Sequence, residues 1–241
     1  MSMASRLGGV VVALGLLAPL PVGAQASALA DPTLANNDGA RAIGLAVRDW
    51  LVRQTGDGVD LSGLTLRVVP EGDSYRVELG IGGRYFNDAV VVGDGALVAT
   101  VKPLDGGRWE VVNAVLPPQL RAEMREGAVG APGEASVMTI AIESQKTTGT
   151  FDPSLAGPST FVSRVSGYGS EMRSAAGVQT TRIGKMMGRS EWLPTGPGRV
   201  TIQGDSTLEE YSSVQPLPDG SQVQVSIERM SGATRIENFD L

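Results

Sequence analysis

The 241-residue sequence contains no cysteine and no histidine. Without cysteine there can be no disulfide bond, no CxxC redox motif and no thiolate nucleophile. Without histidine the chain lacks the side chain that titrates nearest neutral pH and a very common metal ligand, which excludes Ser-His-Asp triads and His-containing zinc sites. We therefore expect no metal, no cofactor and no enzymatic activity. The one catalytic alternative that survives is a His-independent carboxylate hydrolase acting on glycans.

Aromatic residues are also scarce, at 5% of the chain, and the formal net charge is −6. An acidic chain offers no general attraction to nucleic acid, so we expect no nucleic-acid partner. Hydrophobic residues make up 41% and charged residues 19%, with 32 Gly and 14 Pro. These values are typical of a foldable, turn-rich protein of one or two domains.

The first 26 residues have the pattern of a secretory signal peptide. Arg6 precedes an apolar run from Leu7 to Leu20, and small residues follow in overlapping A-x-A arrangements around Ala24, Ala26 and Ala28. The apolar run is shorter than the roughly 20 residues that cross a bilayer, so a transmembrane anchor is not expected. We favour cleavage after Ala26 and a periplasmic or secreted location.

One amphipathic helix is predicted near the start of the mature chain, over residues 39–54. Its apolar positions follow helical spacing, Asp38 is placed to cap its start and Gly56 its end. From residue 64 the period changes to two, and residues 64–68, 75–81 and 109–115 alternate as strands between Gly-containing turns. Residues 35–126 therefore predict a helix followed by an antiparallel meander, with a short helical candidate at residues 119–126 after Pro117-Pro118.

A loop or boundary is predicted at residues 127–133, and a second β-rich region at 134–241, which can be continuous with the first sheet. Alternation is clear at Met138 to Ile142, Val200 to Ile202 and Val223 to Ile227, with a hairpin connector at residues 216–220 and a final strand at 234–241. Residues 149–197 show only weak alternation. The fold class predicted is α+β, mainly β, with an N-terminal amphipathic helix packed on a largely antiparallel, curved, meandering sheet that continues through the C-terminal half.

Short motifs give no catalytic assignment. Gly204-Asp205-Ser206 matches the nucleophile block of G-D-S esterases, but the required histidine is absent and a turn is the simpler interpretation. Glycine-rich segments near residues 80 and 167 and Gly184-Lys185 fail the phosphate-binding patterns, and Asp57 to Asp60 lacks the ligands of a calcium loop. Candidate acids for a glycosidase are Glu143, Asp152, Asp205, Glu209 and Glu210, which are otherwise expected to be solvated.

Charge is distributed unevenly over the C-terminal half. Residues 160–195 carry five basic and two acidic side chains, whereas residues 196–241 carry three basic and seven acidic ones. Cross-strand ion pairs explain both blocks, and a basic rim for an anionic headgroup is the functional alternative. Three methionines in the basic block suit an adaptable apolar groove or a loosely specified core. The candidate ligand-binding residues are Arg164, Arg173, Arg182, Lys185, Met172, Met186 and Met187.

The chain has the order signal peptide, helix, meander and many short strands, and it contains the segments Phe151-Asp152-Pro153-Ser154 and Pro158-Ser159. In these features it resembles exported bacterial envelope proteins built from extended β-sheets. These are the AsmA-like, YdgA-like and LolA-like groups. The resemblance covers about a third of the chain and contains no diagnostic motif. It implies lipid handling or scaffolding without chemistry. The lack of an inner-membrane anchor departs from the AsmA-like pattern.

The leading hypothesis is an exported, non-catalytic envelope protein that binds an amphiphile or a protein partner along a curved β-sheet. An anionic lipid or an envelope protein is the partner expected. The alternatives are the carboxylate hydrolase and a structural or adaptor subunit of an envelope complex.

Overall fold

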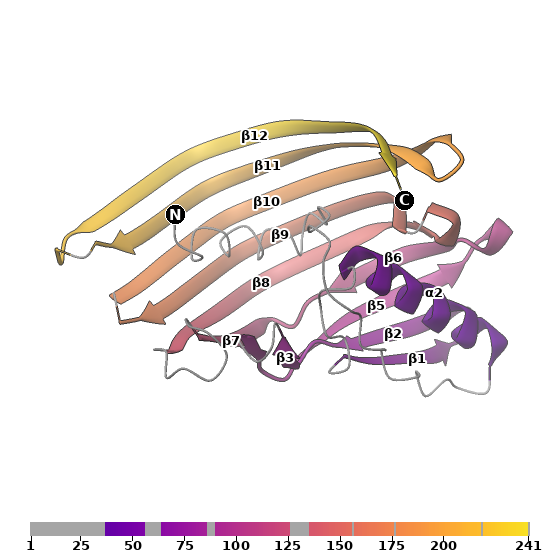
Figure 1. Ribbon diagram of the computed structural model, residues 1–241, viewed down its shortest axis with the longest axis horizontal. Coiled ribbons are helices and arrows are strands. Elements are labelled where there is room, and N and C mark those ends of the chain that lie inside the picture. Colours follow the sequence, from indigo (N-terminus) through magenta and orange to yellow (C-terminus); the bar gives the residue numbers. More distant parts are fainter. Residues whose placement is uncertain are drawn as a thin grey trace.

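The computed structural model describes residues 37–55, 64–85, 90–125, 135–155, 157–175, 177–217 and 219–240 (Figure 1). Four features predicted above lie outside these residues: the signal peptide, the Gly56 cap, the acidic turn at residues 57–60 and the boundary at 127–133. Within the described residues the protein has one α-helix, two short 3-10 turns and strands that join in a 12-stranded sheet. The prediction of a mainly β protein is confirmed.

The helix is α2 (Asp38–Thr55), and the two 3-10 turns are η2 (Asp105–Gly107) and η3 (Pro153–Leu155). The shorter strands are β1 (Thr65–Glu71), β2 (Ser74–Gly80), β3 (Gly83–Tyr85), β4 (Val90–Val92), β5 (Ala96–Pro103), β6 (Trp109–Val115) and β7 (Gln119–Arg125). The long strands are β8 (Ala135–Asp152), β9 (Gly157–Ser174), β10 (Gly177–Gly196), β11 (Arg199–Pro216) and β12 (Gln222–Asp240).

The sheet is antiparallel and open, with the order β1-β2-β5-β6-β8-β9-β10-β11-β12. The strand β8 joins the two halves of the chain, because its first part pairs with β7 and its last part with β6. A side branch formed by β3, β4 and β7 leaves the main path, so the first half is not the simple meander predicted. The strands of residues 64–125 and 135–240 nevertheless belong to one sheet.

The helix α2 begins at Asn37. The Ala40 N–H donates to the Asn37 Oδ1 at 3.1 Å, and the Arg41 N–H donates to the Asn37 carbonyl at 3.0 Å. Asn37 is therefore the N-cap residue, and the prediction that Asp38 caps the helix is wrong by one position. Asp38 instead lies in the first turn, where a carboxylate is favourable beside the positive end of the helix dipole.

The main hydrophobic core lies between α2 and the β1-β2-β5 corner of the sheet. Ala40 and Ile43 of α2 are 0% and 2% exposed and share this core with Leu66, Val68 and Val77 of the sheet. In Figure 1 the helix lies in front of β1, β2 and β5. None of the helices described has both the length and the apolar character needed to cross a membrane.

The segment predicted as a short helix, residues 119–126, forms strand β7 instead over its described part, Gln119–Arg125. Leu120 and Met124 are buried and alternate with exposed residues, and β7 pairs on one side with β8 and on the other with β4. Tertiary pairing thus decides the conformation of a sequence whose local preference is ambiguous. Residues 149–197, which alternate weakly in sequence, contain the end of β8 and all of β9 and β10.

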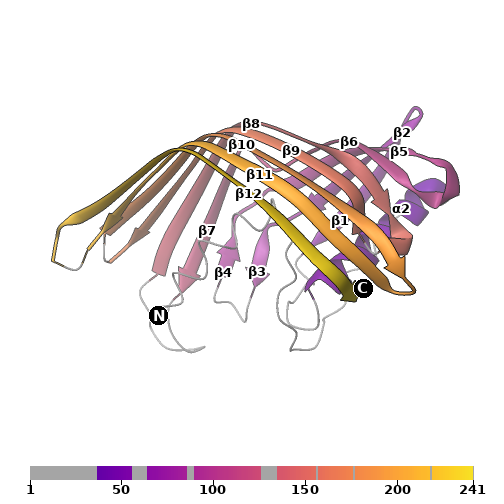
Figure 2. The same ribbon diagram turned by 90° about the horizontal axis from the view of Figure 1, so that it is seen from above.

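The five long strands bend sharply near their middle, so that the sheet forms an arch (Figure 2). At one position in each strand the regular pairing is interrupted, while the pairs on both sides keep their register, as with Ile142↔Tyr168 and Ser144↔Ser166. We call these positions the bend row: Glu143, Gly167, Gly184, Glu210 and Glu228. Gly167 and Glu210 have positive φ values of 62° and 56°. The same local irregularity in adjacent strands bends the sheet, as β-bulges do.

The alternation of side chains shifts by one residue at the bend row. In β8 the exposed residues are Thr139, Ala141 and Glu143, and then Ser144 and Lys146. In β10 the exposed residues likewise change from Val178 and Arg182 to Lys185, Met187 and Arg189. Each long strand therefore places two consecutive residues on the outer side of the bend, and this shift determines which side chains share a face.

Candidate functional site: the concave face of the arch

The arch has a concave face, on the side of α2, and a convex face (Figures 1 and 2). Contacts identify the concave side chains. Phe151 of β8 packs edge-on against Trp50 of α2, with ring centroids 6.2 Å apart. Ile142 of β8 is buried in a cluster with Leu120 of β7, and Tyr168 of β9 packs against that cluster. The cross-strand register extends these assignments across β9 to β12.

Two rows of concave side chains flank the bend and form what we call the crease. Row one contains Ile142, Tyr168, Ile183, Tyr211 and Ile227, which are cross-strand neighbours from β8 to β12. Row two contains Gln145, Val165, Met186, Leu208 and Met230. Every member is apolar, aromatic or amide-bearing. With strands about 4.8 Å apart, the crease extends about 19 Å across the five long strands.

Gln145 is the only amide in the crease, and both of its polar atoms are occupied. Its Nε2 donates to the Leu116 carbonyl at 2.6 Å, and its Oε1 accepts from the Leu116 N–H at 2.9 Å. Gln145 thus satisfies the backbone of the chain where β6 has ended, and it presents no unpaired polar atom to the crease.

Beyond the crease the concave face continues with uncharged and mostly small residues. One row contains Ile140, Ser170, Thr181, Ser213 and Val225. On the other arm, the next row contains Thr147, Ser163, Gly188, Ser206 and Gly232. None of the four rows contains a charged residue. Within the crease itself, Ile142 and Ile183 are buried.

The charged residues of the long strands alternate onto the convex face. There Arg189 pairs with Asp205 at 3.4 Å, and Arg229 pairs with Glu209 at 3.9 Å. The expectation of cross-strand ion pairs between the basic and acidic blocks is confirmed for Arg189 and Asp205, whereas Arg229 and Glu209 both belong to the acidic block. Their arginine side chains are 68% exposed, so each pair contributes little to stability.

All three tryptophans of the chain lie at one end of the concave face. Trp109 packs at a tilt against Phe151 with ring centroids 5.8 Å apart, and a Cβ atom at Gly157 would lie close to both Trp192 and Trp50. A cavity of about 260 Å³ opens beside them, lined by α2 and by Trp109, Phe151 and Pro153. The Trp50 Nε1 is buried and has no hydrogen-bond partner among the described residues.

The predicted ligand-binding residues do not form one site. Arg164, Arg173, Arg182 and Lys185 lie on the convex face, where exposed side chains alternate with the concave rows. Met186 belongs to the crease and Met172 lies on the same face near the strand end, opposite Met138 and Gln179. Met187 points to the convex side and is 43% exposed. The nine-residue spacing of the three arginines places them on two strands at different heights, not in one row.

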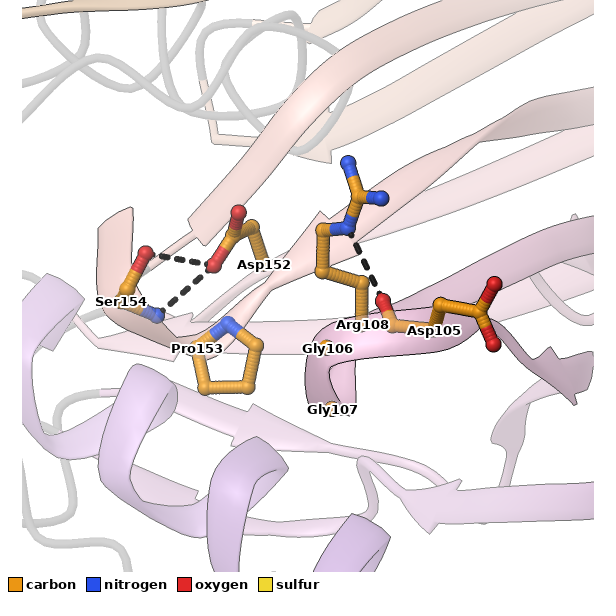
Figure 3. Close-up of a pocket in the computed structure, with 7 residues that line it drawn as sticks. All are labelled: Asp105, Gly106, Gly107, Arg108, Asp152, Pro153 and Ser154. Carbon is orange, nitrogen blue, oxygen red and sulfur yellow. Dashed lines mark hydrogen bonds between the residues drawn. The ribbon is translucent and has the colours of Figure 1, made fainter.

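The predicted acids are separated in the same way. Glu143, Asp205, Glu209 and Glu210 lie on the convex face, and Asp205 is in an ion pair. Asp152 lines an open cleft beside η2 and η3 (Figure 3). Its Oδ1 accepts from the Ser154 N–H at 2.9 Å and from the Ser154 Oγ at 2.6 Å, so it stabilises the local turn. Gly204-Asp205-Ser206 lies inside β11, and the turn expected there is wrong.

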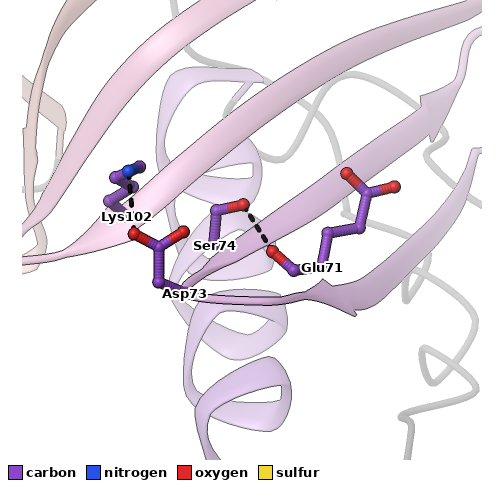
Figure 4. A network of polar contacts seen from close by, with 4 residues as sticks. All are labelled: Glu71, Asp73, Ser74 and Lys102. Carbon is purple, nitrogen blue, oxygen red and sulfur yellow. Dashed lines mark hydrogen bonds and ion pairs between the residues drawn. The ribbon is translucent and has the colours of Figure 1, made fainter.

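A second polar network joins the tip of the β1-β2 hairpin to β5 (Figure 4). The Lys102 Nζ donates to the Asp73 Oδ2 at 2.9 Å, and the Ser74 Oγ donates to the Glu71 carbonyl at 2.8 Å. This single hydrogen bond, donated by Lys102, lowers the pKa of Asp73 and raises the pKa of Lys102. Both charged groups are exposed, and the network links the β1-β2 hairpin to β5 at the protein surface. Within the described part of the chain, no group of three acidic residues could hold a metal ion.

The crease is the feature that sequence reasoning missed. Ile142, Val223, Val225 and Ile227 signal strands, but the shift of alternation at the bend row hides which residues share a face. Comparisons of this chain with protein-family models, with curated proteins and with solved structures found no match.

Proposed function

We propose that this protein binds an amphiphile, with the apolar chain lying in the crease of the concave face. The observation that carries the proposal is the separation of charge: the four concave rows of β8 to β12 contain no charged residue, whereas the convex face carries the ion pairs. A sheet with two equally solvated faces has no physical reason to separate charge in this way.

The dimensions suit one extended hydrocarbon chain. The crease is about 19 Å long across five strands, and its floor consists of aliphatic, thioether and phenol side chains. Each methylene removed from water contributes about 0.8 kcal/mol, so an acyl chain gains several kcal/mol from such a surface without any specific polar contact. Met186 and Met230 add adaptability, because thioether side chains are flexible and polarizable.

This proposal agrees with the hypothesis drawn from the sequence, an exported envelope protein that holds an amphiphile along a curved sheet, and it changes the residues assigned to that role. The crease replaces the basic stretch as the binding surface for the hydrocarbon. The four basic residues of the convex face remain a prediction for an anionic headgroup or a partner. If they bind anionic lipid, replacing Arg164, Arg173 and Arg182 by Glu weakens binding to anionic vesicles and leaves binding of a neutral amphiphile unchanged.

Adjacent residues provide a matched test of the crease. Thr181 and Ser213 lie on the concave face, directly opposite each other, and their neighbours Thr180 and Ser212 lie on the convex face. We expect Thr181→Lys and Ser213→Lys to weaken binding of a fluorescent fatty-acid probe by about tenfold or more, because the hydrocarbon must then contact or displace an ammonium group. Thr180→Lys and Ser212→Lys should bind as the wild type does.

Circular dichroism and thermal melts of all four variants separate loss of folding from loss of binding. Native mass spectrometry of protein purified from its own envelope should show a bound species in the mass range of a lipid. Equal probe binding by the concave and convex variants, or no probe binding by the wild type, would refute the proposal.

A further inference from the structure

Strand β12 is an unprotected edge of the sheet. It is 19 residues long and, among the described residues, pairs only with β11. Both of its faces are exposed, and its apolar residues Val223, Val225 and Met230 are 43%, 41% and 50% exposed. A long edge strand presents a row of unpaired backbone N–H and C=O groups, and natural proteins usually cover or interrupt such an edge. The opposite edge, β1, is only 7 residues long.

A strand that pairs with β12 must reproduce its bend. On β12 the two consecutive outward residues are Glu228 and Arg229, and they align on β11 with the two outward residues Glu210 and Glu209. A straight strand would keep its regular side-chain alternation through this point. Beyond the bend, its side chains on the concave side would then lie opposite convex residues of β12. A second copy of β12 carries the same outward pair, so it can continue the bend.

Only one antiparallel, two-fold symmetric register aligns the two outward pairs. It places Glu228 opposite Arg229 of the second copy, and Arg229 opposite Glu228 of that copy. In this register Ile227 faces Met230 of the second copy on the concave side, and Ser226 faces Ser231 on the convex side. Concave residues therefore meet concave residues along the strand, and a shift of one residue in either direction destroys that agreement.

The same register is complementary in charge. Glu228 has no ion pair among the described residues, and Arg229 has only the pair with Glu209, at 3.9 Å and with the arginine side chain 68% exposed. Two-fold symmetry creates two new Glu–Arg contacts directly across the interface. Opposite charges facing each other across antiparallel strands stabilise the pairing, and like charges destabilise it.

We propose that β12 is a dimerisation edge at which two copies of this chain pair antiparallel with Glu228 facing Arg229. The interface is isologous, as expected of a two-fold dimer. The ten long strands of the two copies would then form one arch with a continuous crease of about twice the length. The dimer follows from the edge, the bend and the charges, and does not depend on amphiphile binding.

Charge reversal tests both the interface and its register. We expect the wild type to be a dimer by light scattering and native mass spectrometry at micromolar concentrations. Glu228→Arg places two Arg–Arg contacts at the interface and Arg229→Glu places two Glu–Glu contacts, so each variant alone should dimerise about tenfold more weakly. An equimolar mixture of the two variants restores both Glu–Arg contacts and should form the heterodimer with about wild-type affinity.

Cross-linking gives an independent readout, because the chain has no cysteine of its own. The double variant Ser226→Cys/Ser231→Cys should form disulfide-linked dimers on mild oxidation, since each cysteine faces the other one of the second copy. The two positions are too far apart along one strand to pair within a chain. Gln222→Cys/Ser231→Cys, shifted by four residues in register, should remain largely monomeric on a denaturing gel.

A monomeric wild type overturns the proposal. So does a dimer that neither charge variant weakens, that the mixture fails to restore, or that cross-links equally in both cysteine variants.

Discussion

The side chain of Glu143 lies over Gly167, in the space that a Cβ atom at residue 167 would occupy. The two residues are opposite each other on β8 and β9 in the bend row, and Glu210 lies over Gly184 in the same manner two strands away. Glycine at these two positions leaves room for the long side chains of the bend on the convex face. The arch therefore depends on a specific order of large and small residues across the strands.

Gly167→Ala should destabilise the protein by about 1–3 kcal/mol. The substitution forces a side chain into a φ of 62° and into the Glu143 carboxylate. Gly169→Ala is the matched control on the same strand, because no atom lies within 4 Å of its added Cβ, and it should change stability by much less. Chemical denaturation measures both. The double variant Gly167→Ala/Glu143→Ala should recover only the steric part of the loss.

Glu210→Gly should stabilise the protein by about 0.5–1 kcal/mol. Glu210 is the only non-glycine residue with positive φ among the described residues, at 56°, and a side chain in that region costs about 1–2 kcal/mol, which outweighs the extra entropy of glycine in the unfolded chain. The neighbouring substitution Glu209→Gly has no such strain to relieve and should be destabilising. Thermal melts of the two variants should shift in opposite directions, and a shared direction would contradict the role of backbone strain at residue 210.

Asn37→Ala should cost about 1 kcal/mol, because it removes the cap that accepts the Ala40 N–H. Asn37→Asp should be tolerated, since a carboxylate can accept the same hydrogen bond and is favourable at the start of a helix. The Tyr75 hydroxyl also donates to Asn37, at 3.4 Å, so Tyr75→Phe separates that contact from the cap. Urea denaturation followed by circular dichroism gives the three values.

The free energy of unfolding should fall at alkaline pH, and ionisation of Tyr168 should cause part of that fall. The variant Tyr168→Phe should therefore lose less stability than the wild type. Burial raises the pKa of the Tyr168 phenol above its usual value near 10, although a hydrogen bond with Ser170 opposes this shift. Above pH 10 the unfolded chain releases this proton before the folded protein does. The stabilisation is therefore present below about pH 10 and is lost as the pH rises through the folded pKa. Denaturation curves from pH 8 to 11.5 should show a smaller decline for Tyr168→Phe than for the wild type.

Much of the secondary structure could be predicted from local pattern. The helix at residues 39–54 and the strands around Val68, Val77 and Val111 were readable because each buries one face in the core beneath α2, and burial on one side imposes a period. The helix predicted at residues 119–126 is wrong because local pattern does not show the pairing with β4 and β8 that makes residues 119–125 a strand.

The long strands were harder to predict, because little covers them. In β9 most side chains are only partly buried on either face, so the alternation that marks a strand is weak. The same weak alternation hides which residues form the candidate site. Arg164, Arg173 and Met186 are near each other in the sequence, yet the shift of alternation at the bend puts Met186 on the concave face and the arginines on the convex one.

Composition and local pattern determined what this protein lacks and where its chain turns from helix to strand, because those properties depend on residue type and on neighbours a few positions apart. The tertiary structure decided which side chains meet. The bend row is built from Glu143, Gly167, Gly184, Glu210 and Glu228, residues spread over most of the C-terminal half. Only the alignment of five strands brings these residues into one line, and that line separates a charge-free concave face from a charged convex one.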